Sequence, residues 1–184
     1  IPQHHKLAGL TVKTSNLCSE ITLPTGIDKE GRDRTAVCCL SSLNLEKYDE
    51  WKDDNNFIPD VMRMLDNVID YNYYSVDKAK NSNLKHRPVG LGVMGFQDAL
   101  YKLRIPYASN QAVDFADKSM ECISYYAIEA SMNLAKERGS YESFDGSLWS
   151  KGILPIDSLK SFKKVRGKFL DVNMDEQLDW SSLR

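Results

Sequence analysis

Residues 36–45 read AVCCLSSLNL, and the stretch opens with the apolar run Ala36–Leu40. A short apolar run between polar segments is typical of a buried strand, so a strand is predicted here, within the region 35–45. A second short strand is predicted near Val89, followed by a glycine turn and the start of a helix before Tyr101. Strands separated by helices favour an α/β fold.

Helices are predicted on both sides of the second strand. Residues 56–71 carry apolar side chains at spacings of three and four, which indicates a helix with one buried face. Residues 110–138 form a longer candidate helix, with Ser109 or Asn110 as N-cap and Gly139 after its end. The polar residues 77–87 are predicted to be a linker. The rest of the chain divides into an N-terminal loop and extended segment (1–26), a mainly helical part (56–138) and an irregular tail (139–184) with an extended piece at 152–157.

Composition excludes several classes of protein. The 184 residues are 42% hydrophobic and 27% charged with a net charge of −2, and a nucleic-acid-binding domain would normally carry a basic excess. A solvated face explains a basic cluster near the end better than a phosphate-binding surface does. No apolar run is long enough to span a membrane, and the first residues lack a signal peptide, so a cytoplasmic protein with reduced thiols is expected. The cluster comprises Lys160, Lys163, Lys164, Arg166 and Lys168.

The chain does not begin with Met, and we expect a processed product, a split or intein-interrupted gene, or an excised fragment. Its four cysteines form no CxxC pair, and its three histidines are not at zinc-binding spacing to them, so no metal site is predicted. The residues concerned are Cys18, Cys38, Cys39, Cys122, His4, His5 and His86.

The stretch TSNLCSE, residues 14–20, places a cysteine between a carboxamide and a carboxylate. If it is extended, Asn16, Cys18 and Glu20 share one face, because side chains alternate along an extended chain. Glu20 could then act as a base toward a substrate hydroxyl beside the thiol. The alternative is a surface loop with a buried thiol, since free cysteine usually behaves as a small hydrophobic residue.

Cys38 and Cys39 are adjacent in the predicted strand. Neighbouring side chains on a strand point to opposite faces, so one thiol can face a cavity while the other packs in the core. The alternative is that both are buried structural thiols.

The sequence GLGVMG, Gly90–Gly95, matches the GxGxxG pattern of dinucleotide-binding folds. The strand before it is very short and begins at Pro88, and no acidic strand end follows about 20 residues later. A tight turn with close helix packing is therefore favoured over a Rossmann-like module, which stays open as an alternative.

Four separated blocks resemble the catalytic large (α) subunit of class I ribonucleotide reductases, in the order found in that family. The resemblance extends from about residue 8 to about residue 160. It implies part of a ten-stranded α/β barrel with a central catalytic finger loop, in which GLGVMG binds no dinucleotide. The blocks are SNLCSEITLPT (15–25), AVCCLSSLNLE (36–46), RPVGLGVMGFQDALY (87–101) and KGILPIDSL (151–159).

The resemblance also implies roles in the reduction of ribonucleoside diphosphates to deoxyribonucleotides. Cys18 matches the thiyl-radical cysteine, Glu20 the carboxylate that takes the 3′-hydroxyl proton, and Asn16 the carboxamide that orients the substrate. Cys38 matches one of the two cysteines that become a disulfide. Ser15 and Leu40 are the residues expected to line the substrate site.

Cofactors and partners are implied in the same way. No cofactor is expected on this segment: a metal-containing small subunit supplies the radical, and nucleoside triphosphate effectors bind elsewhere in the full subunit. Thioredoxin or glutaredoxin is the expected reductant, with no nucleic acid or membrane as partner.

Several parts of the family pattern have no counterpart here, including the second reducing cysteine, the allosteric domain, the radical-relay tyrosines and the C-terminal cysteine pair. We therefore expect no turnover from the chain alone, and a non-catalytic scaffold stays open as a further alternative. Unpaired strand edges of a partial barrel predict that the isolated chain is oligomeric or marginally stable.

Overall fold

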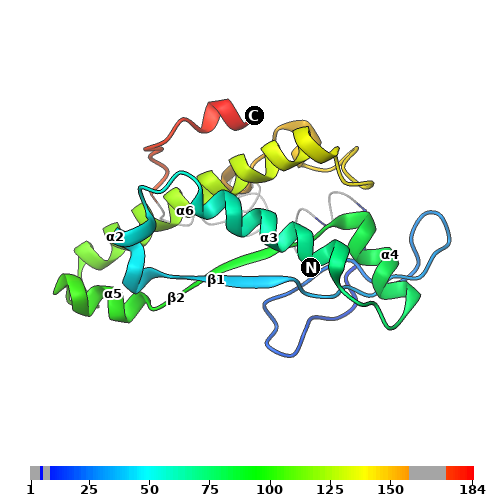
Figure 1. Cartoon of the computed structure of the whole chain (residues 1–184), viewed down its shortest axis with the longest axis horizontal. Helices are drawn as coiled ribbons and strands as arrows, with labels where there is room; N and C mark the ends of the chain where they lie inside the picture. Colours follow the sequence, from blue (N-terminus) through cyan, green and yellow to red (C-terminus); the bar gives the residue numbers. More distant parts are fainter. Residues whose placement is uncertain (1–4, 6–8, 158–172) are drawn as a thin grey trace, which may run out of the picture.

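The computed structural model describes residue 5, residues 9–157 and residues 173–184. The basic cluster at 160–168 and residues 158–172 of the tail predicted to be irregular lie outside these ranges. In the described part of the chain, a small sheet lies beneath two long helices (Figure 1). The structure is therefore mixed α/β, as predicted, with a small sheet and not a complete barrel.

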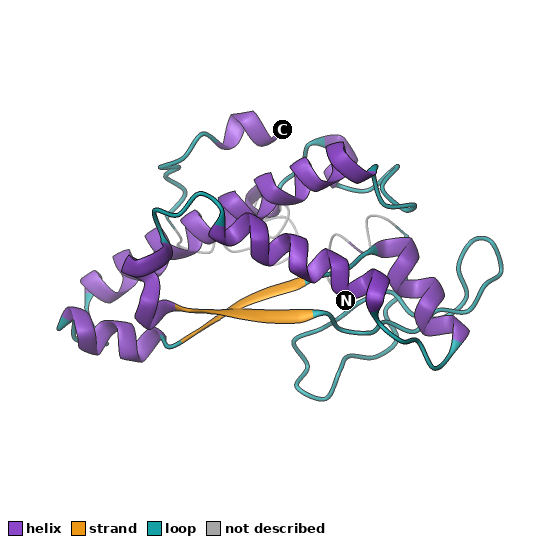
Figure 2. Cartoon of the chain, in the orientation of Figure 1, coloured by secondary structure: helices purple, strands orange, loops and turns teal. Residues whose placement is uncertain are grey.

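The sheet pairs β1 (Leu40–Asn44) with β2 (Gly90–Met94) in parallel. Leu40 lies opposite Gly90 and Asn44 opposite Met94. Parallel strands need a crossover connection, and here all of it is helical or loop: η1 (Leu45–Lys47), α2 (Tyr48–Trp51), α3 (Phe57–Tyr71) and α4 (Asp77–His86) (Figure 2).

The predicted strand at Ala36–Leu40 is wrong in its position. The strand begins at Leu40, where β2 supplies a ladder partner. Thr35 and Val37 bond instead to α4; for example, the Thr35 N–H donates to the Lys78 carbonyl at 3.1 Å. Because α4 supplies hydrogen-bond partners to this backbone, the segment does not need a neighbouring strand. A prediction based on apolar residues alone therefore placed the strand too early in the chain.

The predicted linker at 77–87 is also wrong, because Asp77–His86 forms α4. Asp77 lies in its first turn and Lys85 and His86 in its last, so the charges complement the helix dipole. Arg87 then adopts a left-handed conformation (φ 43°). The helix ends there because a residue before proline is disfavoured in the α region.

Both long helices are present where the sequence predicted them. α3 covers the range predicted from its apolar spacing and buries Ile58, Met62, Leu65 and Ile69. After α5 (Phe96–Leu103), α6 runs over Asn110–Arg138. The Ser109 hydroxyl caps it by accepting the Ala112 N–H at 3.2 Å.

The main core lies where α3 and α6 pack together over one face of the sheet (Figure 1). Leu43 points into this core, whereas Leu40 and Ser42 on the same strand are exposed. Much of the opposite face of the sheet is therefore exposed among the described residues. The buried members of the core are Leu43, Leu45, Trp51, Ile58, Met62, Leu65, Ala99, Ile123, Ala130 and Leu134.

The glycines of GLGVMG are explained by neighbours within the protein. Gly90 and Gly92 lie within β2, not in the predicted turn, and a Cβ on Gly90 would collide with the Leu40 side chain. Gly95 forms the turn into α5 with φ 71°, and a Cβ there would collide with the Asn44 side chain. Gly95 thus agrees with the tight turn favoured from the sequence, whereas Gly90 and Gly92 pack against side chains of the neighbouring strand.

The C-terminal part contains short 3₁₀ turns: η2 (Trp149–Lys151), η3 (Pro155–Asp157) and η4 (Trp180–Leu183). The extended piece predicted at 152–157 is wrong for its last three residues, where the Asp157 carboxylate accepts the Leu154 N–H at 2.9 Å. Trp180 and Leu183 pack with Tyr125 and Leu154 in a second core. Across the described ranges, no helix combines the length and apolar character that crossing a membrane requires.

Candidate functional site

The segment around Cys18 is a tight turn, so its predicted extended conformation is wrong. The Ser19 N–H donates to the Asn16 carbonyl at 3.1 Å, and the Asn16 N–H donates to the Ile21 carbonyl at 3.3 Å. Ser19 has φ 65°, a left-handed conformation that breaks strand alternation. Cys18 is exposed near the tip of this turn, which also argues against the buried-thiol alternative.

The turn nevertheless joins two of the predicted residues. The Asn16 Nδ2 donates to Glu20 Oε1 at 2.5 Å, and the Asn16 Oδ1 accepts the Ile21 N–H at 2.9 Å. The carboxamide is therefore bonded at both ends, and it fixes the Glu20 carboxylate through a charge-assisted hydrogen bond. Asn16 and Glu20 come together as expected, by a turn and not by alternation.

A hollow of about 210 Å³ lies between this turn, the segment leading into β1 and the start of β2. Glu20, Cys38 and Leu40 line it, together with His5, Cys39, residues 21–23 and residues 88–90. Cys18 and Ser15 are not among its lining residues. The structure thus brings three of the six predicted site residues to one hollow and leaves the radical-cysteine candidate two residues from Glu20, outside it.

Cys38 and Cys39 differ in exposure, although both are among the residues that line the hollow. Cys38 is exposed at the hollow and Cys39 is buried, so the alternative of two buried thiols is wrong. Burial, and to a lesser degree the neighbouring Cys38, raises the pKa of Cys39. A thiol kept protonated in this way is a poor nucleophile, and Cys38 is the more accessible member of the pair.

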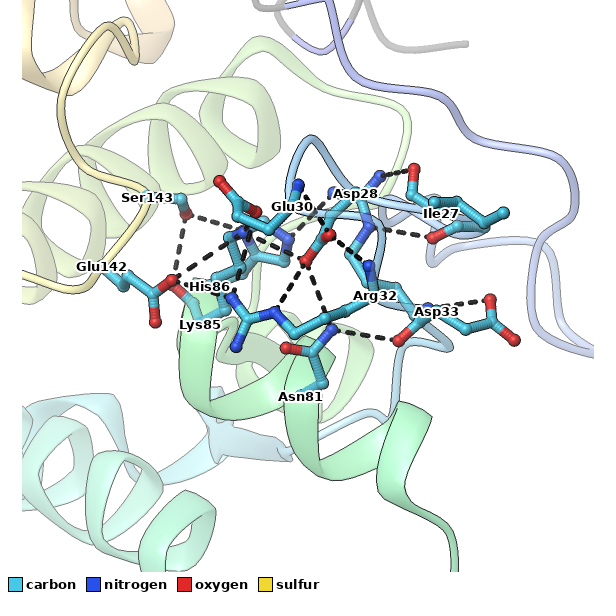
Figure 3. Close-up of polar contacts among 12 residues, drawn as sticks. Ile27, Asp28, Glu30, Arg32, Asp33, Asn81, Lys85, His86, Glu142 and Ser143 are labelled. Carbon is cyan, nitrogen blue, oxygen red and sulfur yellow. Dashed lines mark hydrogen bonds and ion pairs between the residues drawn. The ribbon is translucent and has the colours of Figure 1, made fainter.

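A polar network anchors the loop 27–34 beside the site (Figure 3). Lys85 of α4 pairs with the buried Asp28 at 3.1 Å and also with Glu30. Arg32 reaches Glu142 across the chain at 3.1 Å. Burial opposes ionisation of Asp28, but hydrogen bonds from the Arg32 N–H and Lys85 hold its pKa well below the usual range.

His86 joins three segments of the same region (Figure 3). Its Nε2 lies 3.2 Å from an Arg34 nitrogen, and its Nδ1 lies 2.6 Å from the Ser143 hydroxyl. Because arginine only donates, Nε2 must accept, and Nδ1 therefore carries the proton and donates to Ser143. Burial and the Arg34 charge lower the pKa of His86 to about 4, so the ring is neutral near pH 7.

Sequence reasoning missed the residues that form the far wall of the hollow and the support behind it. Pro88 and Val89 line the hollow, and Asn83 of α4 bonds to the backbone beside Cys38. The charge order along 77–86 and the proline at 88 were signals for a helix there. No group of three or more potential metal ligands occurs within the ranges that the structure covers.

The comparisons with known proteins identify the class. The family described as "Ribonucleotide reductase, barrel domain" matches residues 2–184, and the chain belongs to this family. The ribonucleoside-diphosphate reductase subunit alpha of Chlamydia muridarum is 50% identical over 179 residues, which cover 94% of this chain and 17% of that protein. The Helicobacter pylori (strain J99) subunit alpha is 43% identical, over 90% of this chain and 20% of that protein. The Caenorhabditis elegans large subunit is 38% identical, over 95% and 21%.

The chain therefore spans about a fifth of the length of these relatives. Membership of this family disfavours the dinucleotide-binding alternative, and the packing around Gly90 and Gly95 gives those glycines a structural reason.

Proposed function

We propose that this chain is the part of a ribonucleoside-diphosphate reductase large subunit that carries the radical cysteine and one reducing thiol. One observation carries the proposal: Glu20, held by Asn16, lines the same hollow as Cys38, and Cys18 lies two residues from Glu20. A carboxylate base and a thiol reductant beside one small cavity suit chemistry on a ribose.

The residues would divide the reaction as follows. A thiyl radical on Cys18 takes the 3′ hydrogen of a ribonucleoside diphosphate, while Glu20 accepts the 3′-hydroxyl proton. Asn16 orients the substrate and Glu20. The 2′-hydroxyl leaves as water, and Cys38 with a second thiol from outside this chain supplies two electrons and two protons and becomes a disulfide. Cys18 then returns the hydrogen atom to C3′, which restores the thiyl radical. Ser15 and Leu40 contact the substrate.

The proposed activity requires an assembly. The open face and edges of the β1–β2 sheet would join the remaining large-subunit polypeptide in the ten-stranded barrel. A metal-containing small subunit would generate the radical, and thioredoxin or glutaredoxin would reduce the disulfide. In this proposal the segment itself binds no cofactor, effectors bind elsewhere in the subunit, and the isolated chain does not turn over.

The test uses the complete large subunit containing this segment, together with its small subunit. Cys18→Ser, Glu20→Gln and Cys38→Ser are assayed for deoxynucleotide formation. Loss of a group that acts on the reacting atoms is expected to lower kcat by about a thousandfold or more.

Cys122→Ser is the matched control, because Cys122 is half-buried on α6 at a different hollow. It should keep kcat within about twofold of the native value. Substantial turnover by Cys18→Ser would contradict the proposal and favour a non-catalytic scaffold.

A further inference from the structure

Asn83 is a fully buried side chain on α4 with an unusual set of partners. Its Oδ1 accepts the Val37 N–H at 3.1 Å, and its Nδ2 donates to the Val37 carbonyl at 3.0 Å. A carboxamide has the same donor and acceptor as a peptide group. Asn83 therefore bonds Val37 as a neighbouring strand would, at a place where no strand lies beside it.

The residue after Cys38 is fixed from another direction. The Gly90 N–H of β2 donates to the Cys39 carbonyl at 2.9 Å. The Asn83 Nδ2 also lies 3.8 Å from the buried Cys39 sulfur. Val37 and Cys39 are thus both anchored, one by a helix side chain and one by a strand, and Cys38 between them projects into the hollow.

We propose that Asn83 is a positioning residue that fixes the direction of the Cys38 thiol. It acts through the Val37 backbone and touches no substrate. The proposal rests on the proposed function, in which Cys38 is a reducing thiol, and it adds a residue from α4 to the machinery of that site.

The chemistry of the position supports a specific role over simple core filling. A buried carboxamide costs free energy unless all its groups are paired, and an apolar residue at 83 would leave the Val37 N–H and carbonyl without these partners. The other buried residues of α4 are Ala79, Ser82 and Lys85, of which the first two are small. The site therefore accommodates a group that reaches the backbone of Val37.

The test variant is Asn83→Asp in the complete reductase, because it has nearly the same shape and loses only the donor. An ionised carboxylate would oppose the Val37 carbonyl, whereas a protonated one can donate to it. We expect kcat to fall about tenfold or more, with KM within about twofold, since Cys38 acts after the substrate is bound. The kcat of the variant relative to the native enzyme should recover as the pH is lowered.

Asn81→Ala is the matched control. Asn81 is on the same helix and donates to the Asp33 carbonyl at 3.0 Å, away from Val37. It should keep kcat and its pH profile close to native. Where Asn83→Asp does not fold, Asn83→Ser replaces it, because its shorter side chain removes both bonds without adding charge. Native kcat and pH profile in a folded Asn83 variant would overturn the proposal.

A second measurement separates this inference from the proposed function. The alkylation rates of Cys38 and Cys122 by iodoacetamide are compared by mass spectrometry in native and Asn83→Asp enzyme. The Cys38 rate should change several-fold while the Cys122 rate stays the same; an unchanged Cys38 rate would overturn the positioning role. If Cys38→Ser kept full turnover, the catalytic role of Cys38 would fail, and the alkylation rates would still decide whether Asn83 holds it.

Discussion

Cys18 and Cys38 are supported in opposite ways. The turn that carries Cys18 depends on its own atoms, chiefly the two bonds of the Asn16 carboxamide, and its tip is open to solvent. The segment that carries Cys38 is bonded to α4 at Thr35 and Val37 and to β2 at Cys39. One thiol is held locally and the other by the rest of the fold.

This difference separates two requirements of the proposed chemistry. A thiol that receives a radical from elsewhere must be reachable by another part of the assembly, which suits an exposed turn. A thiol that completes a disulfide must meet its partner in a fixed geometry, which suits a segment anchored on both sides. The described residues therefore anchor the backbone on both sides of Cys38, whereas the turn of Cys18 is held by its own atoms.

The largest expected effect on stability concerns leucine-to-alanine substitutions, one on β1 and one in the turn of Cys18. Leu43→Ala on β1 removes a leucine that is 3% exposed, whereas Leu17→Ala removes one that is 100% exposed beside Cys18. Leu43→Ala should cost about 2–5 kcal/mol of unfolding free energy. Leu17→Ala should stay within about 0.5 kcal/mol. Urea unfolding of the chain followed by circular dichroism measures both, and similar costs would erase the contrast.

The second-largest expected effect is a loss of unfolding free energy at acidic pH, which arises from His86. The pKa of His86 is about 4 in the fold against 6.5 for the free side chain. Between these values the unfolded chain binds a proton that the folded chain does not, so stability falls as the pH is lowered. From pH 6.5 to about 5, above the range where carboxylates titrate, the loss should be about 2 kcal/mol.

The measurement is urea unfolding as a function of pH, with His86→Gln as the control. This variant has no imidazole, so its stability should vary less over the same pH range. Equal pH dependence in the two proteins would show that His86 does not titrate as its surroundings imply.

The smallest effect concerns the backbone at Ser19, which has φ 65°. Ser19→Gly suits this conformation, whereas Ser19→Val should strain the turn by about 1–2 kcal/mol. Limited proteolysis of the turn should therefore be about tenfold faster for Ser19→Val and near native for Ser19→Gly. Equal cleavage of both variants would contradict the left-handed turn.

The sequence predicted the features that depend on residues near one another along the chain. Apolar spacing placed α3 and α6, and Ser109 was correctly identified as a cap. The difference in exposure between the adjacent Cys38 and Cys39 agrees with what their adjacency predicted. In each case residues close together in the sequence determine the local structure, and contacts with distant residues are consistent with it.

The secondary-structure predictions were wrong where the local structure depends on a residue far away in the sequence. The start of β1 depends on β2, about 50 residues later, and the segment before it bonds to α4. The polar stretch 77–86 looked like a linker because the buried roles of Asn83 and Lys85 depend on Val37 and Asp28. Ser19 was expected to be extended because only glycine signals a left-handed residue clearly.

The parallel pairing of β1 with β2 has a consequence during synthesis. When β1 leaves the ribosome its only strand partner in the described sheet does not yet exist, because residues 45–89 must be translated first. Translation at about 5–20 residues per second makes that interval several seconds long. For that time the nascent chain exposes an unpaired strand beside two thiols, Cys38 and Cys39, and an unpaired strand edge invites association with other chains.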